Sequence, residues 1–276
     1  MRFTKHTSRG AGPLVVAAFL ASACATARNY LDPEGPRHLG GAARAPELRP
    51  LLRIVSFNIE YGRRIDVALT LLGEAPLRDA DVIALQEMDA PGVERIAATL
   101  ELNYVYFPSS RLSDTGRDFG TAILSPWPLV EPRKLVLPHA SRIKGGRRAV
   151  TIATLDRGMD RYRVYSVHLP SPLGVSGAQR RDQVRTILAD VETSADPVLV
   201  LGDFNTREVG RLFEEKDFLW LSKTVGTTTR RSGMRFSLDH IFARGLPGGA
   251  TYEMGAVRDN RGASDHRPVW ALVTPR

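Results

Sequence analysis

The chain has 276 residues, of which 43% are hydrophobic and 25% are charged, and its formal net charge is +8. This length and composition suit a soluble globular protein with one large domain or two small ones. Cys24 is the single cysteine of the chain, which excludes an intramolecular disulfide, a catalytic thiol elsewhere and a cysteine-based zinc site. The positive charge suits an anionic substrate or surface, although a solvated arginine-rich exterior explains it as well.

The first 27 residues have the layout of an export signal. Arg2, Lys5 and Arg9 precede the short apolar run "PLVVAAFLASACA", which is too short to span a membrane. The segment "LASAC" resembles the lipobox of bacterial lipoproteins, in which the cysteine is acylated after cleavage. Ala21 stands where that motif prefers leucine, so plain cleavage after Ala25 stays open. We expect lipidation at Cys24 and therefore a membrane anchor, with simple secretion or a periplasmic location as the alternative.

Residues 28–50 are rich in proline, glycine and charge and show no hydrophobic periodicity. Such a composition is typical of a flexible linker. We therefore predict a tether between the membrane and the folded domain over residues 28–50.

From residue 51 onward, apolar strand-like runs alternate with helical patterns. In chain order they predict a strand at 51–59, a helix at 66–75, a strand at 81–88, a helix at 91–102, strands at 103–108, 119–125, 129–137, 147–156 and 161–169, a helix at 178–194, and strands at 197–204, 235–243, 250–257 and 266–273. The consecutive strands in the middle indicate antiparallel pairing. Since no repeat or interior linker interrupts the pattern, residues 51–276 are predicted to form one α/β domain.

Several of the predicted strands end on polar side chains that do not match the apolar run before them. These residues are Asn58, Glu60, Glu87, His168, Asp203, Asn205 and Asp239, followed by Asp265 and His266 just before the last strand. If the strand ends meet at one edge of the packed sheets, these side chains converge in one cleft. Each of them also has an ordinary explanation as a cap, a turn residue or a satisfied half-buried group.

The chemistry of this set favours a hard metal ion. Carboxylates with carboxamides and no thiolate suit Mg²⁺ or Mn²⁺, which prefer oxygen ligands and leave positions for phosphate oxygens. Histidines next to such a site can transfer protons or stabilise charge on a phosphoryl group. Zinc held by His168 and His266 is conceivable, but the excess of carboxylates argues against it.

Six motifs in fixed order, "SFNIEYG", "IALQEMD", "SVHLP", "LGDFNT", "SLDHIF" and "ASDHRPV", resemble those of the endonuclease/exonuclease/phosphatase superfamily. The resemblance covers nearly all of residues 51–273. It implies a four-layer sandwich of two mixed β-sheets flanked by helices, as in deoxyribonuclease-I-like enzymes. It also implies divalent-metal-dependent hydrolysis of a phosphate ester.

The resemblance assigns a role to each polar residue. It implies that Glu87 is the principal metal ligand, assisted by Asn58, with Glu60 as a further acidic contact. Asp265 is either a second metal contact or a support for the loop of His266. Asp203 would position or deprotonate the attacking water, and Asn205 would donate to the phosphate. The remaining implied roles concern the histidines: His266 is held and kept basic by Asp239, and His168 contacts the phosphate or acts as an acid.

The substrate is less well defined by the sequence. The basic segment with Arg147 and Arg148 could line the approach to the phosphate, although a solvated hairpin explains it as well. We expect a monomeric phosphodiesterase that acts outside the cytoplasm on nucleic acid or a phospholipid headgroup. The alternatives are a phosphomonoesterase acting on inositol phosphates and a non-catalytic binding lipoprotein.

Overall fold

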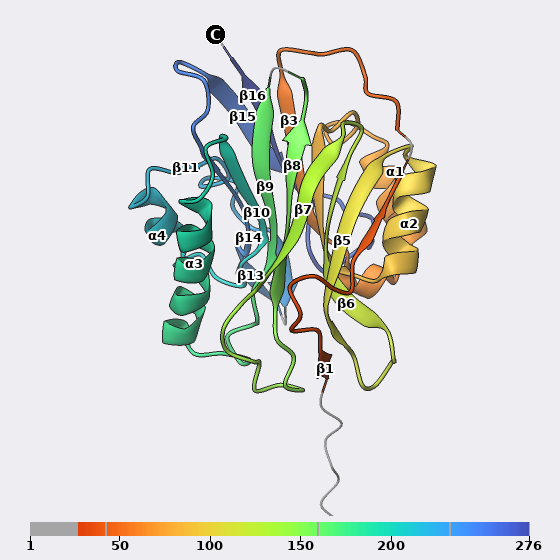
Figure 1. The fold of residues 1–276 in the computed structure, drawn as a ribbon, viewed down its shortest axis with the longest axis vertical. Helices are drawn as coiled ribbons and strands as arrows, with labels where there is room; N and C mark the ends of the chain where they lie inside the picture. Colours follow the sequence, from red (N-terminus) through yellow and green to blue (C-terminus); the bar gives the residue numbers. More distant parts are fainter. Residues whose placement is uncertain (1–26, 42, 159, 232, 276) are drawn as a thin grey trace, which may run out of the picture.

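The computed structural model describes residues 27–41, 43–158, 160–231 and 233–275. In this part of the chain two mixed β-sheets lie face to face, with α1 and α2 on the outer side of one and α3 and α4 on the outer side of the other (Figure 1). The helices are η1 (Glu60–Gly62), α1 (Ile65–Leu72), α2 (Ala90–Thr99), α3 (Gly177–Val191) and α4 (Gly210–Glu214). The predicted four-layer α/β sandwich is confirmed.

The first sheet has eight described strands in the order β1-β5-β6-β4-β3-β16-β15, with β2 also pairing with β5. Their bounds are β1 Arg28–Asn29, β2 His38–Gly40, β3 Leu52–Asn58, β4 Val82–Met88, β5 Asn103–Arg111, β6 Asp118–Ser125, β15 Thr251–Ala256 and β16 Val269–Thr274. The strands β3 and β4 are parallel, so their carboxyl ends meet at one edge of the sheet. Asn58 and Glu87 therefore come from the same edge.

The second sheet has six described strands in the order β11-β14-β10-β9-β8-β7. Their bounds are β7 Leu129–Val136, β8 Ala149–Asp156, β9 Arg161–His168, β10 Val198–Asp203, β11 Leu219–Trp220 and β14 Asp239–Arg244. Here β9 and β10 are the parallel pair. A separate hairpin of β12 (Thr229–Arg231) and β13 (Met234–Phe236) precedes β14.

The hydrophobic core consists of three layers. The central layer lies between the sheets and takes residues from both, for example Ile54 and Leu201. The two outer layers lie under α1 and α2 and under α3. Polar contacts also join the sheets, because the buried Thr121 of β6 and Thr151 of β8 form a hydrogen bond of 2.9 Å. This packing fixes the sheets relative to each other, and with them the two halves of the site described below.

The boundaries of α1, α2 and α3 agree with the predicted patterns to within a few residues, and local capping explains the starts of α2 and α3. Asp89 caps α2 by accepting a hydrogen bond from the backbone N of Gly92, and a proline lies in the first turn. Ser176 and Gln179 form a reciprocal capping box at the start of α3. The predicted strand 235–243 is divided into β13 and β14, so Asp239 begins a strand of the sheet and does not lie within one.

The prediction of a flexible tether over residues 28–50 is wrong for its first part. Residues 28–29 and 38–40 form β1 and β2, which pair with β5 along its outer edge. Lys134 also donates from Nζ to the carbonyl oxygen of Tyr30 at 3.2 Å. An uncovered edge strand exposes unpaired backbone groups, and these residues satisfy them. The domain therefore begins well before residue 51.

The predicted export signal and Cys24 lie outside the described residues. Among the helices of the described chain, none is long and apolar enough to cross a membrane. Lipidation and export therefore stay predictions.

Candidate active site

The register of the second sheet places three of the predicted residues in one row. Asp203 at the end of β10 lies opposite His168 on β9 and opposite Asp239 on β14. Residues directly opposite one another in a sheet present their side chains on the same face. The row therefore faces the first sheet at the end where β3 and β4 also finish.

The first sheet brings Asn58 and Glu87 to this row. Asn58 pairs with Gln86 in the parallel ladder, and the pairing of β4 with β6 shifts register between Gln86 and Met88. Glu87 sits in this β-bulge with a φ of 61°, a backbone conformation that a non-glycine residue rarely adopts. Bulges re-aim side chains next to active sites, and strained residues of this kind cluster there. The bulge thus explains how a carboxylate is presented by a buried strand.

The sequence Gly202-Asp203-Phe204-Asn205 is explained by close packing and a tight turn. A Cβ atom on Gly202 would lie 1.8 Å from the carbonyl oxygen of Val167, so this position requires glycine. After the strand, Asn205 has a φ of 54°, and its backbone N donates to Asp203 Oδ1 at 2.8 Å. The turn fixes the Asp203 carboxylate from its own backbone.

Asn58 joins the two sheets through its side chain. Its Nδ2 donates to Glu87 Oε1 at 3.2 Å and to Asp203 Oδ2 at 3.1 Å. Its Oδ1 accepts from the backbone N of Glu60 at 3.1 Å. Asn58 therefore holds the two carboxylates next to each other.

Asn205 supports the same carboxylate. Its Nδ2 donates to Asp203 Oδ2 at 3.1 Å and to the carbonyl oxygen of Leu169 at 2.9 Å. Its Oδ1 is buried and has no hydrogen-bond partner among the described residues. One amide hydrogen of Asn205 thus orients Asp203 and the other is bound to Leu169, while the implied role of Asn205 as a phosphate donor stays a prediction.

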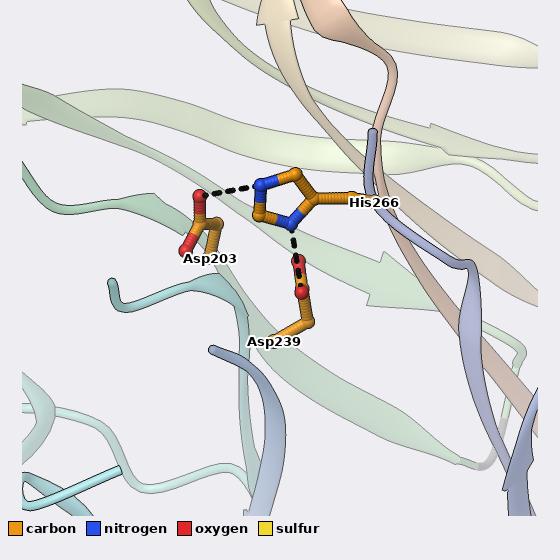
Figure 2. Close-up of side chains that lie close together, drawn as sticks. All are labelled: Asp203, Asp239 and His266. Atoms are coloured by element: carbon orange, nitrogen blue, oxygen red, sulfur yellow. Dashed lines mark hydrogen bonds and ion pairs between the residues drawn. The ribbon is translucent and has the colours of Figure 1, made fainter. Parts of the chain in front are cut away.

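His266 lies between two aspartates (Figure 2). Its Nδ1 is 2.8 Å from Asp239 Oδ2, and its Nε2 is 3.7 Å from Asp203 Oδ2. One ligand atom from each of these residues lies within 4.8 Å of the others, a spacing that could hold a metal ion. However, the two ring nitrogens face different carboxylates, so we interpret the group as a hydrogen-bonded Asp239–His266 pair whose other ring nitrogen forms an ion pair with Asp203.

The loop that carries His266 is fixed to β3. The backbone N of His266 donates to Ser264 Oγ at 3.0 Å, and this hydroxyl donates to the carbonyl oxygen of Asn58 at 2.6 Å. The side chain of Asn260 donates to the carbonyl oxygens of Ser264 and His266, both at 2.6 Å. Ser264, the serine of the S-D-H motif, thus has a structural role, since it holds His266 next to Asn58 at the end of β3.

Burial and mutual charge shift the pKa values of these groups. Burial raises the pKa of Asp203 to about 7; the Asp239 and Glu87 carboxylates add to this, while His266 opposes it. Burial also raises the pKa of Glu87 despite its hydrogen bond from Asn58. Burial would lower the pKa of His266, but Asp239 and Asp203 together raise it to about 10. His266 is therefore a cation at neutral pH.

His168 is the counterpart of His266. Its Nε2 lies 3.5 Å from Asp203 Oδ2 and 3.8 Å from Glu87 Oε1. Burial, helped by the nearby Arg148, holds the pKa of His168 well below 6.5. A neutral imidazole at this point can donate or accept a hydrogen bond, but it lacks the second ring proton that a histidine acting as a general acid would transfer.

The carboxylate set fits the divalent cation that the resemblance implies. Glu87 and Asp203 are held side by side with raised pKa values, which shows that burial and mutual repulsion disfavour their charged forms. The Glu87 side chain is 13% exposed and reaches the pocket. Oxygen ligands in such a site suit Mg²⁺ or Mn²⁺, whose charge would offset this repulsion.

A pocket of about 540 Å³ opens above these residues. Glu87, His168 and Asn205 reach it from the sheets, and Arg148 lies beside them with its guanidinium 4.4 Å from the centre of the Phe119 ring. The two predicted substrate-binding arginines therefore differ. Arg148 lines the pocket, whereas Arg147 does not and donates from its backbone N to Asn29 Oδ1.

The acidic residues Glu60 and Asp265 lie at the rim of the site. Glu60 Oε1 accepts from Arg63 at 2.5 Å, and its Oε2 accepts from the backbone N of Asp265 at 3.2 Å. Asp265 Oδ2 lies 3.6 Å from Arg231 NH2. Asp265 Oδ1 also lies 4.0 Å from His266 Nε2. The role of Glu60 and Asp265 as metal contacts stays a prediction.

Arg231 is a pocket residue that sequence reasoning missed. Its NH2 lies 3.3 Å from His266 Nε2, and it lines the pocket from the β12–β13 hairpin. An isolated β-bridge between Thr229 and His266 holds this hairpin against the site. The two adjacent arginines in "TTTRR" could have indicated a phosphate-binding segment in the sequence. Only the bridge to His266, however, places one of them in the site.

His240 alternates in facing with Asp239 and points to the outer side of the second sheet. It is fully buried, its Nε2 lies 3.2 Å from the carbonyl oxygen of Thr206, and its ring packs edge-on against Trp220. Burial lowers its pKa from 6.5 to about 4. His240 is therefore a neutral structural residue behind the site.

This depressed pKa predicts a loss of stability in acid. Below pH 6.5 the unfolded chain protonates His240 while the folded protein does not until about pH 4, so the free energy of unfolding falls as the pH decreases through this window. The contribution is about 3 kcal/mol at pH 4. Urea unfolding at several pH values should give a flatter pH dependence for His240→Gln than for the wild type. Parallel pH profiles would contradict it.

The fold and the site define a class: two packed β-sheets with carboxylates and histidines collected at one end are the framework of a phosphate-ester hydrolase. Residues 55–266 match the model of the Endonuclease/Exonuclease/phosphatase family, and the chain belongs to this family. Its members act on phosphate esters.

Solved structures show the same fold. The chain is similar to an endonuclease/exonuclease/phosphatase from Bacteroides vulgatus (17% identity, TM-score 0.64, 82% of this chain and 99% of that chain covered). It is also similar to sphingomyelinase C from Streptomyces griseocarneus (20% identity, TM-score 0.62, 81% and 99% covered). A third similar structure is a mannosyl-6-phosphatase from Bacteroides thetaiotaomicron (17% identity, TM-score 0.59, 80% and 99% covered). No curated protein matches the chain.

Proposed function

We propose that this protein is a divalent-metal-dependent phosphodiesterase that acts outside the cytoplasm. One observation carries the proposal: Asn58 holds the Glu87 and Asp203 carboxylates together beneath the pocket, next to a cationic His266. Hydrolysis of a phosphate ester needs a metal ion to polarise the phosphate and a cation to stabilise the negative charge that develops. The carboxylates would bind the metal ion, and His266 would supply the cation.

The residues of the chain divide the reaction between them. Glu87, with Asn58 beside it, would hold Mg²⁺ or Mn²⁺, whose charge would polarise the phosphate. Asp203, with a pKa raised to about 7, is suited to accept the proton of the attacking water at neutral pH. His266, kept cationic by Asp239, stabilises the negative charge that builds on a phosphoryl oxygen.

The two arginines and His168 complete the binding of the phosphate. Arg148 and Arg231 line the pocket and offer charged donors to its oxygens. Neutral His168 offers a hydrogen bond without adding charge. Asn205, whose amide hydrogens are bound to Asp203 and Leu169, positions the base.

The choice of a diester over a monoester can be measured directly. With Mg²⁺ or Mn²⁺ we expect faster hydrolysis of bis(4-nitrophenyl) phosphate than of 4-nitrophenyl phosphate. DNA, RNA, sphingomyelin and inositol phosphates are then assayed as substrates. A Glu87→Gln preparation serves as the blank for contaminating enzymes. Preference for the monoester would assign the site to a phosphatase, and equal rates in the blank would remove the proposal.

The proposed location rests on the sequence of residues 1–27. If Cys24 carries a lipid anchor, labelled palmitate should be incorporated into the wild-type chain and not into Cys24→Ala. Absence of label from the wild type, with cleavage of the signal, would replace the anchor by simple secretion.

A further inference from the structure

Three exposed apolar side chains surround the mouth of the pocket. Leu173 is 79% exposed, Met234 is 59% exposed and Ile143 is 49% exposed. Single exposed apolar residues are ordinary on a protein surface, but a group of them around one opening is not. We call these residues the three tips.

The three tips belong to segments that meet at the pocket. Ile143 lines it directly, and so does Ser171, two residues before Leu173. The backbone N of Arg142 donates to the carbonyl oxygen of Gly174 at 2.7 Å, so the first two segments lie side by side. Met234 lies opposite Arg231 in the β12–β13 hairpin, and Arg231 also lines the pocket.

Basic residues flank the tips. Arg142 and Lys144 lie on either side of Ile143, and Arg230 lies directly opposite Arg235 in the hairpin that carries Met234. Like charges placed opposite each other across a hairpin are destabilising unless an anion lies between them. Among the residues that the structure describes, no carboxylate pairs with Arg142, Arg230 or Arg235.

Two acidic residues of the same mouth are paired with cations, whereas Asp118, which also lines the pocket, accepts a hydrogen bond from the hydroxyl of Tyr30 at 2.8 Å. Asp114 pairs with Lys144, and Asp89 pairs with Arg117 at 2.7 Å. Beside its apolar tips the mouth therefore presents three arginines, Arg142, Arg230 and Arg235, for which the described residues provide no acidic partner. This combination matches a surface with acyl chains below a layer of anionic headgroups.

The start of the described chain lies at the same mouth. Ala27 lines the pocket, and its backbone N donates to the carbonyl oxygen of Lys144 at 2.7 Å. The segment that precedes it in the sequence contains the apolar run "PLVVAAFLASACA". Whatever this segment attaches to is thus joined to the protein at the rim of the pocket.

We propose that the three tips and their flanking arginines dock the mouth of the pocket onto an anionic phospholipid surface. Because the tips lie on segments that line the pocket, the substrate is then a phosphate ester presented by a lipid headgroup. The docking surface stands on its own geometry, whereas the substrate class rests on the proposed function.

The docking can be tested without turnover. Since Cys24 is the single cysteine, Cys24→Ala gives a cysteine-free full-length chain, into which Ile143→Cys, Leu173→Cys or Met234→Cys is introduced and labelled with the fluorophore NBD. Tyr252→Cys is the matched control, because Tyr252 is 39% exposed and pairs with Val273 at the opposite end of the sandwich. The proteins are mixed in EDTA with phosphatidylcholine vesicles, with or without phosphatidylglycerol.

We expect a blue shift at all three tips on vesicles containing phosphatidylglycerol, with several-fold quenching by nitroxide-labelled lipids, and neither effect at position 252. Equal responses at position 252, or none at the tips while the protein still binds, would show that the N-terminal segment alone attaches it. A response to single-stranded DNA and not to vesicles would assign the mouth to nucleic acid. Docking without any phosphoesterase activity would leave this surface intact and remove the proposed function.

Discussion

Glu87→Gln is expected to lower turnover by about 10³-fold while leaving the fold intact, because the change removes the charge that binds the metal and keeps the shape of the side chain. Glutamine can still accept the hydrogen bond from Asn58, so the link between the sheets is preserved. Turnover at saturating Mg²⁺ or Mn²⁺, together with the urea midpoint, separates the loss of catalysis from a loss of stability. Addition of EDTA to the wild type should have the same effect.

A matched control is available at Glu101. This residue also has a positive φ, of 53°, but it is exposed and lies outside the pocket. Glu101→Gln should therefore retain wild-type turnover. Full activity of Glu87→Gln, or of the wild type in EDTA, would exclude a metal-dependent mechanism.

The second large effect is expected at the Asp239–His266 pair. Asp239→Asn removes the charge that keeps His266 cationic, and His266→Ala removes the cation itself, so each should lower turnover by about 10²-fold. Because the two residues act as one unit through a hydrogen bond of 2.8 Å, the double variant should be hardly worse than either single variant. Kinetic constants of all four proteins form a double-mutant cycle that measures this coupling.

The half-buried pair of His139 and Asp182 is the control for this cycle. Its atoms are 3.3 Å apart, and neither residue lines the pocket. His139→Ala and Asp182→Asn should leave turnover near that of the wild type. Losses that multiply in the Asp239/His266 double variant would mean that the two side chains act independently.

The positions of the strand-end residues could be predicted because hydrophobic periodicity locates the ends of buried strands. A polar side chain at such an end must lie at the edge of the sheet. The structure does bring Asn58, Glu87, His168 and Asp203 together there. The bulge at Glu87 could not be predicted, because it depends on how β4 pairs with β6. The alternation of residues along a strand tells which side chains share a face, but a bulge interrupts this alternation.

Contacts that depend on the placement of whole segments were beyond the sequence. Arg147 and Arg148 alternate in facing, and periodicity alone does not say which of them faces the pocket. Arg231 becomes a site residue only because its hairpin bridges to the His266 loop. The proline- and glycine-rich composition of residues 28–40 hid two short strands, whose pairing is stabilised by β5 and not by their own propensity.

Asn58 and Glu87 come from one sheet, whereas His168, Asp203 and Asp239 come from the other. The spacing of the catalytic groups is therefore the spacing of the sheets, which the side chains of the central layer determine. A thinner or thicker core would move the two halves of the site together or apart without touching any residue in the pocket. In this architecture the hydrophobic core sets the distance between the two halves of the active site. Substitutions deep in the core are therefore a route by which related chains can change their reaction rates.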